Sequence, residues 1–398
     1  MRKVRQALLA IACAVSALAG AENVTVRSLR LVPGDPTLWG VNGSQRFLVL
    51  ASYPDGMQRD VTTQSRLAVS DAKLARVEAA GRIVALADGK FELAAHFAGQ
   101  VAKTTVTAAG ARDPRQFSFA RELGGIFTKR GCNSSDCHGS VKGKGGLKLS
   151  ANALYPQEDY RWIVEGGAYQ VLSAEPAGPR IPRIEKKDPE KSLLLLKPTE
   201  GLPHGGGRRF SQGSADYLAI LNWIKSGAPY GAEADSGSVA IARLEAYPRE
   251  TVLDRQGSQQ LLVTAHLSNG RSEDVTDQVL YTSNNPEVVE VTPEGLVKAR
   301  KTGEAAVMIR AAGQAISAGF GVIAKPAASY PSVPRRNFID HLVFEKLRRF
   351  NIVPSDLAGD EEFLRRVCLD ITGTLPPPAR LREFLAAKDP NKRDQVIE

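Results

Sequence analysis

An internal repeat constrains the fold of this chain more than any other feature: residues 46–100 match residues 260–314 without a gap. The run Asp60-Val61-Thr62 recurs as Asp274-Val275-Thr276, 214 positions later. Glycines recur at the same offset, at Gly56 and Gly270, Gly81 and Gly295, Gly89 and Gly303, and Gly99 and Gly313. A constant offset over this length indicates two copies of one folding unit.

Each copy has the pattern of short β-strands separated by tight turns. Residues 46–53 and 261–267 are rich in apolar and β-branched residues, as strands are. Pro54-Asp55-Gly56 and Ser268-Asn269-Gly270 supply residues that tolerate positive φ in a hairpin turn. Turns at this frequency over a domain of this size predict a small β-sandwich in each copy.

The second copy resembles the bacterial immunoglobulin-like domain of group 2. The resemblance rests on Asp274-Val275-Thr276, on the run from Val289 to Ala299, and on Gly303-Glu304-Ala305. The first copy is more diverged but keeps the same spacing. We therefore predict Ig-like sandwiches over 22–110 and 236–325. The resemblance implies that they are spacers or adhesion modules, in which His96 and His266 are ordinary strand residues.

The N-terminus has the pattern of a secretory signal over residues 1–21. Basic Arg2, Lys3 and Arg5 precede an apolar run that is too short to span a bilayer and ends in small residues. A lipidated Cys13 is the alternative, but the preceding residues lack the usual leucine. No other stretch of 18 apolar residues occurs, so we predict an exported protein of the periplasm or cell surface that does not span the membrane.

Length and composition fit a modular globular protein. The 398 residues exceed the usual size of one domain, and 43% apolar with 24% charged residues is ordinary for a soluble fold. The net charge of +9 is spread along the chain and partly belongs to the signal, which argues against nucleic acid as a partner.

The segment between the repeats carries a candidate haem-attachment motif, Cys132 to His138. Two thiols can form thioethers with the haem vinyl groups, and His138 directly follows Cys137, as the proximal ligand must. The usual motif has two residues between the cysteines, whereas this chain has four. A disulfide, a zinc site that includes His204, a redox-active dithiol and coincidence stay open as alternatives.

His204 is the candidate for the sixth iron ligand. The methionines are Met1, Met57 and Met308, so none lies between residues 139 and 232. His204 is the only other histidine there, and Pro203 with the following glycines suits a loop lying against a flat macrocycle. Local hydrogen bonding in a loop is the alternative role of this histidine.

Helical patterns flank the motif, at residues 119–127 and 215–225, and Gly227 and Pro229 end the second one. With the cysteine motif, His204 and Trp223-Ile224, they resemble the cytochrome-containing surface proteins of planctomycetes. The resemblance implies an α-helical cytochrome c-like domain over 111–232. It also implies one covalent haem c held by Cys132, Cys137 and His138, with iron as the metal, and electron transfer.

The C-terminal part, residues 332–398, is predicted to be helical. Its runs Arg335 to Asp340 and Phe363 to Gly373 resemble the opening of the uncharacterised domain that follows the cytochrome in the same group. The resemblance implies a longer domain, so we expect a truncated one here. We expect Cys368 to be a buried structural thiol, because no histidine lies near it in sequence.

The expected fold class is thus multidomain: two Ig-like β-sandwiches flanking an α-helical cytochrome c-like domain, then an incomplete helical segment. The leading function is single-electron transfer with envelope redox proteins, with the sandwiches as spacers. Adhesion or polysaccharide binding with an accessory haem is the alternative. A haem enzyme is a third class, which histidine ligands on both sides of the iron argue against.

Overall fold

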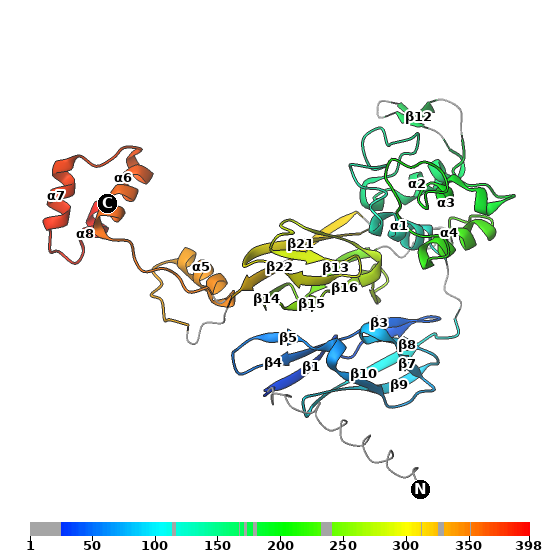
Figure 1. Cartoon of the computed structure of the whole chain (residues 1–398), viewed down its shortest axis with the longest axis horizontal. Coiled ribbons are helices and arrows are strands. Elements are labelled where there is room, and N and C mark those ends of the chain that lie inside the picture. Colours follow the sequence, from blue (N-terminus) through cyan, green and yellow to red (C-terminus); the bar gives the residue numbers. More distant parts are fainter. Residues whose placement is uncertain are drawn as a thin grey trace, which may run out of the picture. The chain divides into compact units, whose positions relative to one another are not determined.

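The computed structural model describes residues 25–113, 117–166, 168–170, 173–177, 181–231, 241–311, 313–324, 330–350 and 352–398. The predicted signal peptide, residues 1–21, lies outside them. The chain divides into two compact units, Met1–Ala328 and Ser329–Glu398 (Figure 1). The first unit contains both repeats and the segment between them, and the second unit is helical.

The first repeat folds into sheets of strand order β1-β4-β5, β2-β10-β9-β6 and β3-β8-β7. The strands are β1 (Ser28–Val32), β2 (Thr37–Trp39), β3 (Ser44–Arg46), β4 (Leu48–Ser52), β5 (Gln58–Asp60), β6 (Arg66–Val69), β7 (Ala75–Val77), β8 (Arg82–Ala85), β9 (Gly89–Phe97) and β10 (Gln100–Ala109). Alternate residues of β9 and β10 face a core that contains Phe47, Leu93 and Val106.

The second repeat has the same topology, with sheets β13-β16-β17, β14-β22-β21-β18 and β15-β20-β19. The strands are β13 (Ile241–Tyr247), β14 (Glu250–Asp254), β15 (Ser258–Gln260), β16 (Leu262–Leu267), β17 (Ser272–Asp274), β18 (Leu280–Ser283), β19 (Val289–Val291), β20 (Leu296–Ala299), β21 (Gly303–Ala311) and β22 (Gln314–Ile323). Strand β22 pairs parallel with β14, as β10 does with β2. The predicted duplication is confirmed at the level of strand order.

The predicted hairpin turns are also confirmed. Gly56 and Gly270 each have φ of 80°, and they connect β4 to β5 and β16 to β17. In each turn an Asx side chain, Asp55 or Asn269, accepts a hydrogen bond from the backbone N–H two residues later. The same turn chemistry therefore sets the register of both hairpins.

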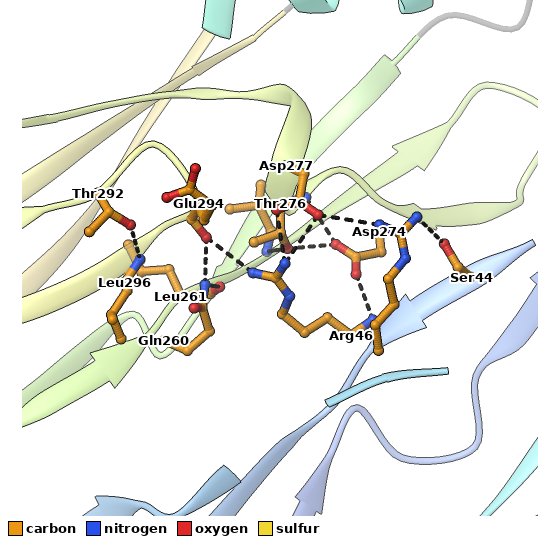
Figure 2. A network of polar contacts seen from close by, with 12 residues as sticks. Ser44, Arg46, Gln260, Leu261, Asp274, Thr276, Asp277, Thr292, Glu294 and Leu296 are labelled. Atoms are coloured by element: carbon orange, nitrogen blue, oxygen red, sulfur yellow. Dashed lines mark hydrogen bonds and ion pairs between the residues drawn. The ribbon is translucent and has the colours of Figure 1, made fainter. Parts of the chain in front are cut away.

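The two repeats contact each other through equivalent residues. The Asp60 carboxylate accepts a hydrogen bond from the Gln260 backbone N–H at 2.8 Å, and the Asp274 carboxylate accepts one from the Arg46 N–H at 2.6 Å. Since Asp274 is the repeat equivalent of Asp60, and Gln260 that of Arg46, the contact is reciprocal. Figure 2 shows the Asp274 half, where the Arg46 guanidinium also binds Asp277 at 2.9 Å.

The segment between the repeats contains short helices and a two-stranded sheet. The helices are α1 (Phe119–Lys129), α2 (Pro156–Val164), α3 (Leu193–Leu196) and α4 (Ala215–Lys225), and the strands are β11 (Ala168–Gln170) and β12 (Ser173–Ala177). The Ser118 hydroxyl caps α1 and the Ser214 hydroxyl caps α4. Phe119 of α1 and Trp223 of α4 lie with ring centres 5.6 Å apart in the core of the segment.

The predicted fold class is wrong for this segment. The described chain consists mostly of β-sheet domains, and the described residues of the predicted 111–232 domain do not form a helical cytochrome c-like domain. The reason lies between the periodic stretches: Gly143, Gly145 and Gly146 all have positive φ, which a helix does not allow. Recurrent prolines then interrupt the chain, at Pro182, Pro189, Pro198 and Pro203.

The segment rests on the second repeat. Arg121 of α1 forms an ion pair with Glu273 at 3.5 Å, and the Gly313 N–H donates to the Asn152 carbonyl at 2.7 Å. A side chain at Gly125 would contact Gln278. Helix α1, which leads into the cysteine motif, is therefore supported by β-sandwich residues.

The second unit contains α5 (Phe338–Arg349), α6 (Asp360–Thr372), α7 (Pro378–Ala386) and α8 (Lys392–Ile397). Leu364, Cys368 and Phe384 form its core, so the expected burial of Cys368 is confirmed. Asp360 forms ion pairs with two residues of α8, Lys392 and Arg393. None of the helices described in the chain has the length and hydrophobicity that crossing a membrane requires.

Candidate functional site

The cysteine motif begins where α1 ends. Gly131 has φ of 68°, which takes the backbone out of the helix, and the Cys132 N–H still donates to the Phe127 carbonyl at 2.8 Å. The His138 N–H donates back to the Cys132 carbonyl at 3.0 Å. The four residues between the cysteines therefore fold into turns that keep Cys132 and His138 together, despite the unusual spacing.

Gly139 makes this closed loop possible. A Cβ atom at position 139 would lie 2.1 Å from the Asn133 carbonyl oxygen, far inside van der Waals contact. Asn133 is itself buried, and its side-chain amide donates to the Thr128 hydroxyl of α1 at 2.9 Å. The glycine after the histidine thus lets the loop pack against its own backbone and against α1.

Both cysteines of the motif are free thiols. Burial raises the pKa of the Cys132 thiol to about 12, although the nearby Arg209 guanidinium acts in the opposite direction. An Arg209 nitrogen lies 3.5 Å from the Cys137 sulfur. Among the described residues, no group of three or more His, Cys, Asp or Glu side chains is arranged to hold a metal ion.

His138 and His204 line the same cavity with nearly parallel rings. Their ring centres are 6.3 Å apart and their ring planes differ by 10°. An ion held between two facing imidazole nitrogens, at the usual metal–nitrogen distance of about 2 Å, would separate the ring centres by about 6 Å. The structure thus brings together the two histidines that the sequence singled out, at a spacing that fits a metal between them.

Both rings are oriented by hydrogen bonds to backbone carbonyls. His138 Nδ1 lies 2.9 Å from the Lys144 carbonyl oxygen and 3.1 Å from that of Leu147, and His204 Nδ1 lies 2.8 Å from that of Gly207. A carbonyl only accepts, so each Nδ1 carries the proton and each Nε2 keeps its lone pair. Burial lowers the pKa of His138, which also favours the neutral, ligating form.

A cavity of about 610 Å³ contains both cysteines and both histidines. Its volume lies within the range of small-molecule and cofactor pockets. Its apolar wall is formed by Phe127, Leu147, Leu149, Leu193, Leu194, Phe210 and Ile220, and its cations are Lys144, Arg183, Lys197 and Arg209. Two thiols, two neighbouring imidazoles and apolar walls fit a covalently attached haem.

A buried carboxyl group holds the end of the loop that follows the motif. Asp159 of α2 is 1% exposed and accepts hydrogen bonds from the Ser150 N–H at 2.5 Å and the Ser150 hydroxyl at 2.7 Å. Burial raises the pKa of Asp159 to about 6. This contact fixes the position of Leu149, which lines the cavity.

Sequence reasoning missed Asp159 and the cavity cations. Arg183 and Lys197 lie in loops and at a short helix, and no periodic pattern marks them. The two histidines of the repeats lie where expected: His96 is on β9 and His266 is on β16, where it contacts Glu245 at 3.0 Å.

A second cleft, of about 890 Å³, is lined by residues of both repeats and of α1. Trp39 lines it, but the Arg271 guanidinium covers the ring at 4.3 Å from its centre. Charged groups of the lining pair with one another, as in Arg82 with Asp277 at 3.5 Å. One face of the Trp39 ring is therefore occupied by Arg271.

Comparison with known proteins identifies two regions of the chain. Residues 242–311 match the bacterial Ig-like domain (group 2), which confirms the resemblance of the second repeat. Residues 338–398 match a protein family of unknown function, DUF1549, which confirms that the C-terminal part belongs to an uncharacterised domain. Neither match includes the segment between the repeats. No curated protein matches the chain.

Among solved structures, the chain is similar to domains 5–6 of the S-layer protein SbsC, with 10% identity and a TM-score of 0.29 over 75% of this chain and 98% of that one. It is also similar to a longer SbsC structure, with 9% identity and a TM-score of 0.20 over 84% of this chain and 32% of that one. Drosophila OTK, extracellular domains 3–5, has 9% identity and a TM-score of 0.14 over 75% of this chain and 99% of that one. Similarities this distant indicate no function.

Proposed function

We propose that residues 112–231 bind one haem covalently and that the protein transfers single electrons in the cell envelope. The observation that carries the proposal is the pair His138 and His204, whose ring centres lie 6.3 Å apart across a cavity that also contains two free thiols. When bound, haem supplies an iron that changes by one electron between ferric and ferrous states.

In this proposal the residues have separate roles. Cys132 and Cys137 attach the macrocycle, and the turns between them keep His138 beside the thiols. The Nε2 atoms of His138 and His204 would hold the iron, because the Nδ1 atoms donate to backbone carbonyls. An iron held by both histidines would have no open position for a small oxidant, which favours electron transfer over haem enzymology.

Apolar side chains line the cavity beside the thiols and imidazoles. Apolar surroundings rearrange little when the iron gains or loses an electron, so they keep the reorganisation energy of electron transfer small. In this proposal the Ig-like repeats are spacers that support α1 and the cysteine motif. The partners are then redox proteins of the envelope, and the predicted signal peptide supports that location.

The test is to produce the full chain together with a haem-maturation system and to assay it after denaturation by the pyridine haemochrome method. We expect one haem per chain that stays attached in denaturant and gives a low-spin spectrum. A Cys132→Ala, Cys137→Ala double variant is the control, which should release any haem on denaturation. A wild-type chain that carries no covalent haem would refute the proposal.

A further inference from the structure

We infer that Arg183 and Lys197 form a binding site for two carboxylates on the ligand of the 610 Å³ cavity, which for haem are its propionate groups. The inference rests on the proposed function and assigns these two residues a role in positioning the cofactor. The cavity also contains charged side chains, and the proposed roles of the thiols and histidines do not account for them.

The cavity lining has an excess of cations. Lys144, Arg183, Lys197 and Arg209 line it, whereas Asp136 is the one carboxylate in the described lining. Three cations of the segment outside the cavity have acidic partners: Arg208 binds Glu200 at 3.2 Å, Lys191 binds Asp188 at 2.8 Å, and Arg130 binds Asp216 at 2.5 Å. The cavity thus gathers four cations around a single carboxylate of its described lining.

Arg183 is held in place but has no counter-charge among the described residues. Its backbone N–H donates to the Ile163 carbonyl of α2 at 2.8 Å, and its carbonyl accepts from the Leu194 N–H of α3 at 2.9 Å. The guanidinium donates to the Gly146 carbonyl, which is a neutral acceptor. Burial lowers the pKa of Arg183, which reflects the cost of holding this cation away from water.

Lys197 lies at the end of α3 and is half-buried. Its N–H donates to the Leu193 carbonyl at 3.2 Å, and the next residue, Pro198, accepts a hydrogen bond from the Arg209 N–H at 2.8 Å. Within the described part of the chain its ammonium group forms no ion pair. A carboxylate in the cavity would give both Lys197 and Arg183 a charged partner, and charge-assisted hydrogen bonds are the strong ones.

Arg209 and Lys144 are less suited to this role. Arg209 contacts the Cys137 sulfur, so it belongs to the thiol end of the cavity, and its other nitrogen donates to the Arg130 carbonyl. The Lys144 ammonium already donates to the carbonyl of Asp136, within the cysteine loop. The vinyl and propionate substituents of haem lie on different edges of the macrocycle. The carboxylate site is therefore assigned to the residues that do not contact the thiols.

The test compares two probes on the full-length apoprotein: iron mesoporphyrin, which has propionates but no vinyl groups to react with the thiols, and its dimethyl ester, which has no carboxylates. Binding is followed by the Soret absorbance. We expect the wild type to bind the acid at least about tenfold more tightly than the ester, as one or two charge-assisted hydrogen bonds imply. Arg183→Gln and Lys197→Gln should each reduce this ratio several-fold.

Two controls separate this role from a structural one. Arg183→Lys keeps the charge and should keep most of the ratio, and Arg208→Gln removes an exposed, paired cation outside the cavity and should keep all of it. Equal binding of acid and ester by the wild type would overturn the inference while leaving haem binding intact. Failure of the wild type to bind either probe would overturn the proposed function as well.

Discussion

Replacing Asp274 with alanine should lower the stability of the structure around this carboxylate, within the second repeat and at its contact with Arg46 of the first, by about 3–5 kcal/mol. The carboxylate accepts hydrogen bonds from the Arg46 N–H at 2.6 Å, the Thr276 N–H at 2.9 Å and the Thr276 hydroxyl at 2.5 Å. Alanine leaves these donors without their partner, and an unpaired buried donor costs about 1–3 kcal/mol. Solvent that enters the new space offsets part of the loss.

The measurement is hydrogen exchange of the Arg46 amide in the full chain, followed by mass spectrometry of the peptide that contains it. A loss of about 3 kcal/mol corresponds to exchange more than a hundredfold faster, if exchange occurs by local opening. Asp60→Ala should act in the same way on the Gln260 amide, because Asp60 is the equivalent acceptor.

Asp254→Ala is the matched control. Asp254 also bridges the repeats, through Arg59 at 3.3 Å, but both side chains are about one third exposed. Exposed pairs contribute less than about 1 kcal/mol, so this variant should change the Arg46 amide little. If Asp274→Ala and Asp254→Ala have the same small effect, the account of the buried carboxylate is wrong.

Three further predictions concern the candidate site. His204→Ala should open one axial position, so that carbon monoxide binds the reduced protein and changes its absorbance spectrum, which the wild type should resist. Gly139→Ala should prevent covalent haem attachment, because the new Cβ would lie 2.1 Å from the Asn133 carbonyl oxygen. The haem content per chain measures the attachment. Burial raises the pKa of Asp159 from 3.8 to about 6. Between these pH values the folded state therefore binds more protons than the unfolded state does. The free energy of unfolding around Ser150 should then fall by about 3 kcal/mol as the pH rises through this window. Protection of the Ser150 amide against exchange, corrected for the intrinsic rate, reports this loss, and Asp159→Asn should abolish the pH dependence.

A different result would contradict each of these three predictions. A His204→Ala variant with unchanged oxidised and reduced spectra would exclude His204 as a ligand. Gly34 has open space around its Cα, so Gly34→Ala should leave the haem content unchanged, and equal haem content in the Gly139 variant would contradict the steric argument. Equal protection of Ser150 at pH 4 and pH 7 would contradict the raised pKa of Asp159.

The sequence was informative where structure is local. The turns at Gly56 and Gly270 need a residue that tolerates positive φ, and the helices at 119–129 and 215–225 follow from apolar spacing and stop signals. The spacing of Cys132, Cys137 and His138 could be read directly from the sequence. The distance between His138 and His204 could not, because it depends on how the chain between them folds.

Three other features depend on tertiary structure and were missed or predicted wrongly. The helical domain was expected from the resemblance and from two periodic stretches, but glycines and prolines interrupt the chain between them, and their conformations exclude long helices there. Arg183 and Lys197 look like ordinary surface cations in the sequence, and only the fold shows that they line a cavity without acidic partners. The repeated Asp-Val-Thr run can be seen in the sequence. The sequence does not show that the aspartate of each copy binds the opposite repeat.

The reciprocal contact between the repeats limits how such modules can assemble. In symmetric oligomers, partners that use the same surface on each other form a closed pair, whereas partners that use different surfaces form rings or filaments. Asp60 and Asp274 each bind the opposite repeat, so the contact surface of each copy is already occupied by the other. A third module could not add to this pair through the same surface. The two repeats of one chain thus form a closed pair through this surface. Any lattice or filament of this protein would have to use another face of the repeats.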